Sequence, residues 1–422
     1  MTMINDLDRF ERVKKSGSIH YAMEAKKCIA DIKDEFHSQL SSMEYFYDIM
    51  ENIIHEPESS DTEEKVIASM CIHVPVELIY AAGARPVRVC GGAYATDQVG
   101  ADFLPAKTCP MVKSTAGALY LGLLPGRVKP KLVVNPSSCD QKKKLGEVVS
   151  GFDDEFYLLE LPPNKDTEES REYWHRVVKR FAKKLESVTG KRITRRNLKK
   201  AIKLVSTAQG RYRHFHKLRS QAPVIFGKDA ILITNAFFFD DLARWTEKLD
   251  ELNREMELRI EKKKHVVHEN APRILLTGSP AIFPNLKLPI LIEKMGGLVA
   301  CEEYCSSSRM LTDSIAVDEW FLYDMIPAIA DRYLKPSTCP NFSPNEDRIR
   351  KILSMIKEFN IDGVVYQSFT GCQLYDMESI TVGKAMDEIN MPTLYLESDY
   401  NPDDSGQLIT RVEAFLESVK NK

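Results

Sequence analysis

Short apolar runs alternate with helical patterns in two separate parts of this 422-residue chain. The runs begin near residues 66, 87, 131 and 156 in the first part, and near residues 273, 298, 362 and 392 in the second. A proline and a glycine bracket the helix that follows the first run of each part, namely Pro75 with Gly83 and Pro289 with Gly297. Strands that alternate with helices form parallel sheets covered on both faces. The sequence therefore predicts an internal duplication of a doubly wound α/β domain of Rossmann or flavodoxin type.

Helical patterns precede and connect these two units. Apolar residues recur at three- and four-residue spacing in the N-terminal part, at Ile29, Ile32, Phe36, Leu40, Met43, Phe46 and Met50. A turn-rich segment at 56–61 follows, and three charged helices are expected at 169–188, 194–218 and 240–264. We therefore expect an N-terminal helical region (1–62), a first α/β domain (63–165), a helical connecting region (166–270) and a second α/β domain (271–422).

Composition and charge argue against several classes of function. The formal charge is only -3. The basic pairs at 195–196 and 199–200 and the run at 262–264 belong to a helical region whose other helices are rich in Glu and Asp, so we interpret them as solvated helix faces. The N-terminus is acidic where a signal peptide would be basic, and no apolar stretch approaches the length of a membrane span. We expect a cytoplasmic protein that binds neither nucleic acid nor membranes. In that reducing compartment, nine cysteines favour metal ligation over disulfides.

Six of the cysteines stand in loops where a predicted strand ends or a predicted helix begins: Cys71, Cys109, Cys139, Cys305, Cys339 and Cys372. The triplet Thr-Cys-Pro occurs at 108–110 and again at 338–340, and Cys372 corresponds to Cys139. The carboxyl ends of parallel strands gather ligands, and free N–H groups at a helix start stabilise a thiolate. Each half of the chain therefore offers a pocket with three metal-binding thiols.

The remaining cysteines are interpreted differently. Cys28 is expected in an amphipathic helix and Cys90 inside a strand just before Gly91, so both are expected to be packing residues, because free cysteine behaves as a small hydrophobe. The third ligand of the second half is either Cys301 or Cys305, and Cys305 is favoured because it follows the strand that contains Cys301. His73 and Gln373 are candidates for contacts around the metal, although a structural hydrogen bond is the commoner role of such side chains.

The spacing of the thiols distinguishes between metals. Structural zinc sites use closely spaced cysteine pairs and close four ligands, whereas only Cys301 and Cys305 are that near one another here. Three thiolates per half instead suit an iron–sulfur cubane whose fourth iron is completed by a bridging atom, water or substrate.

With these motifs in hand, residues 65 to about 420 resemble the 2-hydroxyacyl-CoA dehydratase and benzoyl-CoA reductase superfamily. The resemblance is carried by 71–83 (CIHVPVELIYAAG), Cys109-Pro110, 138–140 (SCD), 292–297 (IEKMGG) and 362–365 (DGVV). Dehydratase subunits of that family hold one cubane on about three cysteines, usually in a heterodimer that binds an acyl-CoA. The six cysteines of this chain are similar instead to those of the double-cubane cluster proteins, a homodimeric branch.

This resemblance implies a cofactor, a partner and a reaction class. Cys71, Cys109 and Cys139 would hold one [4Fe–4S] cubane and Cys305, Cys339 and Cys372 a second, joined by a shared sulfide into an [8Fe–9S] double-cubane cluster. The chain has no G-x-x-x-x-G-K-[ST] phosphate loop, and a separate iron–sulfur ATPase is implied as activator and reductase. The expected function is ATP-coupled, low-potential reduction of small molecules. The alternatives are a 2-hydroxyacyl-CoA dehydratase or acyl-CoA reductase subunit, and an electron-storage protein without its own substrate.

Overall fold

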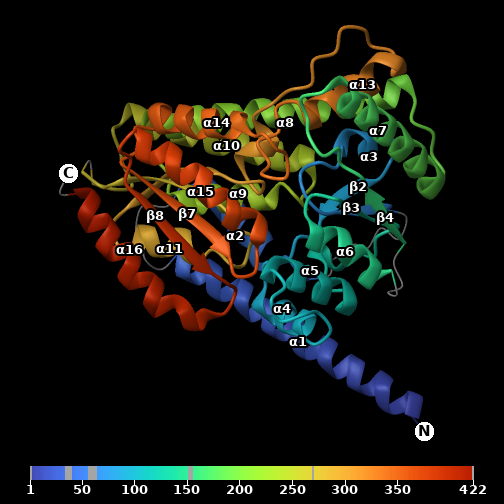
Figure 1. Cartoon of the computed structure of the whole chain (residues 1–422), viewed down its shortest axis with the longest axis horizontal. Helices are drawn as coiled ribbons and strands as arrows, with labels where there is room; N and C mark the ends of the chain where they lie inside the picture. Colours follow the sequence, from blue (N-terminus) through green and yellow to red (C-terminus); the bar gives the residue numbers. More distant parts are fainter. Residues whose placement is uncertain (1, 34–39, 56–63, 151–154, 269, 421–422) are drawn as a thin grey trace.

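Two four-stranded parallel sheets form the centre of the computed structural model, which describes residues 2–33, 40–55, 64–150, 155–268 and 270–420 (Figure 1). The first sheet contains β1 (Val66–Ser69), β2 (Arg85–Arg88), β3 (Leu132–Pro136) and β4 (Phe156–Leu159). The second contains β5 (Arg273–Gly278), β6 (Leu298–Glu303), β7 (Gly363–Phe369) and β8 (Thr393–Ser398). The strand orders, β2-β1-β3-β4 and β6-β5-β7-β8, are equivalent, and the predicted pair of similar doubly wound domains is confirmed.

Both faces of the first sheet are covered because its strand residues alternate between two cores. Ile67 and Val134 face the helices α3 (Val76–Ala81), α7 (Glu168–Thr189), α8 (Arg195–Gln221) and α13 (Leu322–Leu334). Ala68 and Val133 face α5 (Pro110–Leu121) and α6 (Asp140–Val149), and α4 (Tyr94–Ala101) packs on α5. Continuous apolar strands of this kind are typical of a parallel sheet buried on both sides.

The second sheet is covered in the same way. Leu275 and Val364 face α14 (Glu346–Glu358) and α15 (Gln373–Glu388). Leu276 and Val365 face α9 (Gly227–Ala236), α11 (Lys287–Lys294) and α16 (Ser405–Lys420). Three short elements complete the α/β part of the chain: η2 (Pro125–Arg127), α12 (Ser308–Leu311) and η3 (Pro402–Asp404).

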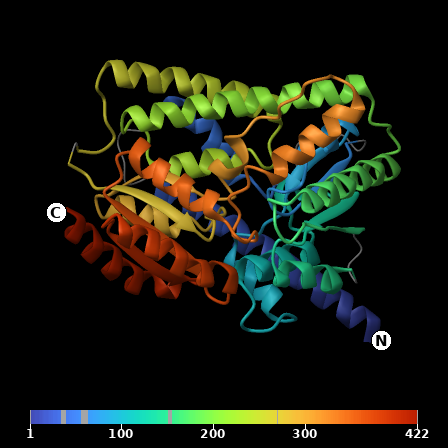
Figure 2. The same ribbon diagram turned by 45° about the horizontal axis from the view of Figure 1, so that its top comes forward.

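The long helix α8 joins the two units. Its N-terminal residues Leu198 and Ile202 belong to the core of the first sheet, whereas Tyr212 and Phe215 belong to the core of the second. A helix of 27 residues is about 40 Å long, which is enough to reach across both sheets. Figure 2 shows α8 running across the molecule above both units, with its neighbour α10 (Leu242–Glu261) beside it over the second unit. The two sheets are therefore held in one packed body.

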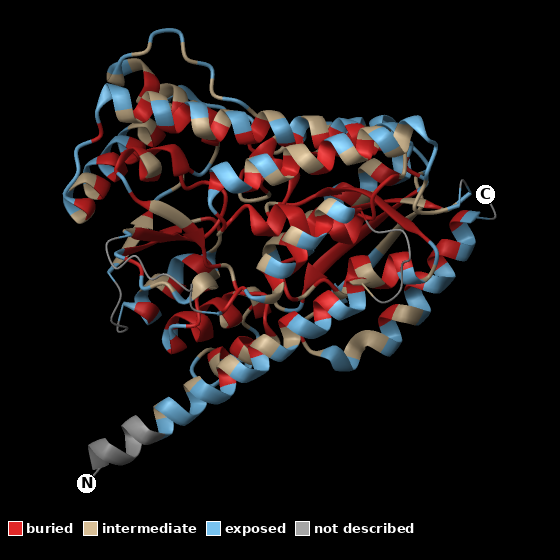
Figure 3. Cartoon of the chain, turned by 180° about the vertical axis from the view of Figure 1, so that it is seen from behind, coloured by how far each residue is buried: buried red, intermediate tan, exposed pale blue. Residues whose placement is uncertain are grey.

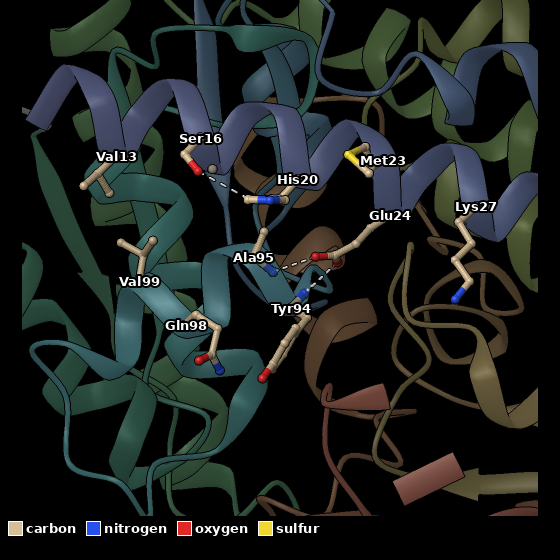
Figure 4. Close-up of a pocket in the computed structure, with 11 residues that line it drawn as sticks. Val13, Ser16, His20, Met23, Glu24, Lys27, Tyr94, Ala95, Gln98 and Val99 are labelled. Carbon is tan, nitrogen blue, oxygen red and sulfur yellow. Dashed lines mark hydrogen bonds between the residues drawn. The ribbon is translucent and has the colours of Figure 1, made fainter. Parts of the chain in front are cut away.

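The N-terminal helix α1 (Thr2–Lys33) packs through its second half and projects from the molecule through its first (Figure 3). Ala25, Ile29 and Ile32 are buried, and residues 9–20 are mostly exposed. The Glu24 carboxylate accepts hydrogen bonds from the N–H groups of Tyr94 (2.8 Å) and Ala95 (2.7 Å), which begin α4, beside a pocket of about 640 Å³ (Figure 4). The short helices η1 (Ser41–Met43) and α2 (Glu44–Glu51) follow; the predicted turn at 56–61 and Phe36 lie outside the described residues.

Some predicted elements differ from those observed. Three helices, α4, α9 and the short α12, were not predicted. Every residue of α9 is buried, its polar residues included, so this helix has no solvent-exposed face to produce an amphipathic pattern. The strand expected to contain Cys90 ends at Arg88, and Cys90 lies in the loop beyond it. None of the helices within the described ranges is both long and apolar enough to cross a membrane.

Candidate metal centre

The six cysteines predicted as ligands line one cavity of about 370 Å³: Cys71, Cys109, Cys139, Cys305, Cys339 and Cys372. Three of them come from each half of the chain, so the halves share one thiol-lined space where a separate pocket in each half was expected. Met111, Pro280 and Met377 supply apolar wall, and Lys142 and Gln141 supply polar wall. The spatial convergence supports the choice of these cysteines, whose role as ligands stays a prediction.

The strand order explains how the thiols reach this cavity. Cys71 and Cys139 follow the neighbouring strands β1 and β3, from whose ends the chain turns to opposite edges of the sheet. Such a switch point is where open α/β sheets bind ligands. In the second unit Cys372 follows β7, but Cys305 follows the edge strand β6. The topological counterpart of Cys305 is therefore the loop with Cys90, so the two sets of three cysteines are not strict copies of one another.

Three of the six cysteines are the N-caps of helices: Cys109 for α5, Cys139 for α6 and Cys372 for α15. The Cys139 sulfur accepts a hydrogen bond from the backbone N–H of Lys142 at 3.4 Å. The pKa of Cys372 is lowered to about 7 because the Cys109 thiol donates a hydrogen bond to it and, against the effect of burial, backbone N–H groups of α15 do so too. The thiolate is the metal-binding form of cysteine, and these helix starts favour it.

Cys71 occupies a strained backbone position. Its φ of 71° lies in the left-handed region, where a non-glycine residue costs about 1–3 kcal/mol, and such strain concentrates at functional sites. Its sulfur lies 3.4 Å from Nδ1 of His73. Burial raises the pKa of Cys71, but the positive charge of Lys142 and the His73 ring more than offset this and hold the pKa well below its usual range. His73, predicted as a contact around the metal, is thus in contact with a candidate ligand.

Gln141 ties a cysteine loop of the first unit to one of the second. Its Oε1 accepts a hydrogen bond from the backbone N–H of Cys109 (2.7 Å), and its Nε2 donates one to the carbonyl of Gly371 (2.8 Å). The two loops are in such close contact that a Cβ added to Gly371 would lie 2.2 Å from the carbonyl oxygen of Lys107. Because Gly371 also has a φ of 79°, only glycine satisfies both demands at this position.

Two further side chains cross between the units. Arg88 donates through Nη1 to the carbonyl of Cys305 (3.0 Å) and through Nη2 to that of Cys71 (3.5 Å). Nε2 of His73 lies 3.0 Å from Oγ of Ser337, two residues before Cys339. The positions of the cysteine loops relative to one another are therefore set by hydrogen bonds from both units, before any metal is considered.

A buried ion network supports the Cys339 loop. Oε1 of Glu303 accepts a hydrogen bond from Thr338 (2.8 Å) and forms an ion pair with Arg309 (2.5 Å), while Arg348 pairs with Oε2. Burial would raise the pKa of Glu303, but the two guanidinium groups hold it at about 2. Both oxygens of the Glu303 carboxylate are engaged, so its position is fixed. Thr338, the residue before Cys339, therefore has a fixed hydrogen-bond partner on β6.

The other predicted residues occupy different surroundings. Cys301 lies within β6 in the core between the sheet and α14, and Cys28 lies on the buried face of α1. Gln373 lines the cavity but is exposed, at its rim. Sequence reasoning missed Gln141 and Lys142, although both stand in the helical turn that Cys139 caps, and it missed Arg88, for which no motif gives a signal.

The chemistry of the site fits a metal–sulfur cluster better than a single ion. Across the described residues, no three His, Cys, Asp or Glu side chains are placed to hold one metal ion. A tetrahedral zinc site would bring four ligands to one ion. In a cubane each thiolate binds a different iron, so its thiolates are spread around a larger space, as the six thiols are around this cavity.

Fold and site together define an α/β protein in which two parallel sheets share one cysteine-lined centre. The family described as 2-hydroxyglutaryl-CoA dehydratase, D-component, matches residues 71–419, and the chain belongs to this family. Members of this family typically bind iron–sulfur clusters. The match begins at Cys71, the first of the six cysteines that line the cavity.

Several named relatives match over most of their length. The protein YjiM of Escherichia coli (strain K12), a candidate dehydratase subunit by its name, is 30% identical over 357 residues, which are 84% of this chain and 91% of that protein. The (R)-phenyllactyl-CoA dehydratase beta subunit of Clostridium sporogenes is 24% identical, over 90% of this chain and 100% of that subunit. A benzoyl-CoA reductase subunit of Thauera aromatica is 22% identical, over 86% of this chain and 92% of that protein. The relatives are subunits of multi-component enzymes.

The close contact between the cysteine loops predicts a specific sensitivity at Gly371. Gly371→Ala should destabilise the metal-free chain by about 1–2 kcal/mol for the positive φ and by about 1–3 kcal/mol more for the contact with Lys107. Gly190→Ala is the matched control, because Gly190 has a φ of 68° with nothing within 4 Å of an added Cβ. Urea unfolding followed by circular dichroism measures both. Equal destabilisation by the two substitutions would show that the loops can separate without loss.

Proposed function

We propose that this chain binds a double-cubane iron–sulfur cluster on its six cavity cysteines and uses it to reduce small molecules. The observation that carries the proposal is the convergence of three thiols from each unit on one cavity. A single cubane would leave half of these thiols without a metal. Two cubanes joined by a sulfide need two sets of three ligands around a common space, and each unit contributes three thiols to this cavity. Soft thiolates also select iron–sulfur clusters over hard metal ions.

The residues of the chain have three tasks in this proposal. The six cysteines bind the cluster, which supplies electron transfer at low potential when it is present. Arg88, His73 and Gln141 keep the cysteine loops in register between the units. Met111 and Pro280 contribute apolar wall that limits access of water. Because the sequence lacks a phosphate loop, the energy of ATP enters through a separate iron–sulfur ATPase. By analogy with the double-cubane cluster proteins, the chain pairs with a second copy of itself as a homodimer.

A second candidate is favoured by the relatives. Those with the most specific names act on CoA thioesters as dehydratases or as a reductase, and they match this chain over nearly its full length. In that case the chain is one subunit of a 2-hydroxyacyl-CoA dehydratase or acyl-CoA reductase, beside a different subunit. A third candidate, an electron-storage protein without a substrate, has the same cluster and lacks turnover.

The first prediction concerns metal content. A preparation made without air should be brown and contain about eight irons per chain, since six thiolates suit two cubanes. Iron and acid-labile sulfide are measured chemically on the same sample, together with zinc. About four irons per chain would favour the dehydratase-type subunit with a single cubane, and zinc without labile sulfide would reject an iron–sulfur centre altogether.

The second prediction separates two neighbouring cysteines. Cys305→Ser should lower the iron content or alter the electron paramagnetic resonance spectrum, because Cys305 lines the cavity. Cys301→Ser is the control, since that thiol is buried in the core between β6 and α14 and should leave the spectrum nearly unchanged. The reverse pattern would transfer the ligand role to Cys301.

The third prediction concerns coupling to ATP. Reduction of a small substrate, such as an alkyne or a nitrogen–nitrogen compound, should require this chain, an activating ATPase of the dehydratase family, ATP and a reductant together. ATP hydrolysis, substrate loss and the cluster spectrum are followed in parallel. Turnover of an acyl-CoA, with no turnover of the small substrates, would favour the second candidate. Reduction at full rate without ATP would reject the coupled mechanism.

A further inference from the structure

Lys142 is a buried cationic residue that lines the cysteine cavity. It is the third residue of α6, whose N-cap is Cys139, and its side chain lines the cavity although the residue is only 7% exposed. Its backbone is pinned at both ends, because its N–H donates to the Cys139 sulfur and its carbonyl accepts a hydrogen bond from Asn135 (2.6 Å). The direction of the lysine side chain is thus set by the same helix start that presents Cys139.

The ammonium group of Lys142 has no oxygen partner within the described part of the chain. The groups that act on its charge are the sulfurs of Cys71, Cys90, Cys139 and Cys305, which belong to both units. They raise the pKa of Lys142 against the opposing effect of burial. Lys142 therefore shares its cavity with thiols of both units, among them Cys71, Cys139 and Cys305.

Other buried cations near the centre are compensated differently. Arg309 forms an ion pair with Glu303, and Lys165 donates to Asp347 (2.6 Å) and to the carbonyl of Ser337 (2.7 Å). Arg88 donates to two backbone carbonyls. A buried ammonium without an oxygen partner costs several kcal/mol unless an anion compensates its charge, so Lys142 at this position favours an anionic group inside the cavity.

We propose that Lys142 is the charge-compensating residue of the cluster, donating a hydrogen bond from its ammonium group to the sulfur-rich group that both sets of cysteines hold. This inference rests on the proposed iron–sulfur centre. Addition of one electron from a reductant makes the bound group more negative by one charge and changes no bond of Lys142. A fixed positive charge beside it stabilises the reduced form more than the oxidised form, since Coulomb attraction grows with the charge. Lys142 therefore raises the reduction potential of the centre.

The test uses the full-length chain, purified without air with its cluster. Lys142→Met removes the charge at similar volume, and Lys142→Arg keeps it. Lys143→Met is the matched control, because it removes the same charge one residue further along α6 from an exposed position. Iron and sulfide content, the midpoint potential in a redox titration and the electron paramagnetic resonance spectrum are measured for all four proteins.

Lys142→Met should shift the midpoint potential to a more negative value, while Lys142→Arg and Lys143→Met stay near the wild-type value. A folded Lys142→Met chain that fails to take up iron, beside a Lys142→Arg chain that does, would also support the inference. If the methionine variant does not fold, Lys142→Gln must give the same negative shift. An unchanged potential in an iron-loaded Lys142→Met or Lys142→Gln chain overturns the inference, and so does an equal shift in Lys142→Arg.

Two other outcomes identify what has failed. A change of KM with an unchanged potential would assign Lys142 to an anionic group of the substrate and overturn its role toward the cluster. A wild-type chain without iron and sulfide overturns the proposed function, and this inference with it.

Discussion

The contact between the two cysteine loops is the constraint on which the centre depends. The carbonyl of Lys107 lies so close to Gly371 that a methyl group would not fit between them, and Gln141 bonds to both sides of this contact. One loop delivers Cys109 and the other delivers Cys372. Each loop is anchored to a different sheet. A change in the distance between the sheets would therefore change the distance between these two thiols. Helix α8, packed on both cores, helps to hold that distance.

Buried charge follows from this arrangement. Arg219 on α8 forms two hydrogen bonds of 3.0 and 2.8 Å with Glu302 on β6, and Glu303 beside it is paired with Arg309. In these pairs the desolvation of each ion is offset by a partner of opposite charge. Lys142 differs because it has no carboxylate partner among the described residues and lines the cavity together with the six thiols. The charges of these ion pairs therefore cancel within the polypeptide. In the proposed function, the charge of Lys142 at the cavity is balanced by the group that the cavity binds.

Part of this structure is readable from the sequence for simple physical reasons. The strands of both sheets are short apolar runs, and cysteines directly after a strand or before a helix must lie at the carboxyl edge of a parallel sheet. Cys305 could be preferred to Cys301 because a strand residue such as Cys301 is committed to the core. By contrast, α9 is buried on all sides, polar residues included, and gives no amphipathic period.

The partners of the cysteines were beyond such reasoning. Arg88 sits in a strand and reaches across to the carbonyl of Cys305, and a contact between residues 217 positions apart leaves no mark on local sequence. Gln141 and Lys142 look like ordinary residues of a charged helix until the cap at Cys139 is placed. The expectation of two matched pockets failed because the internal repeat was compared by motif rather than by strand: Cys71 follows the inner strand β1, whereas Cys305 follows the edge strand β6.

That asymmetry has a consequence for how a cluster would act on the fold. If each unit carried a complete pocket, binding would stabilise each unit separately. In a shared cavity, with loops of both sheets on its wall, any group that binds thiols of both units must hold the units together, and its binding energy then opposes their separation. The matches to the (R)-phenyllactyl-CoA dehydratase beta subunit and the benzoyl-CoA reductase subunit cover 90% and 86% of this chain, which is more than either half of it. Duplication of the α/β domain thus supplies a site that neither half could form alone.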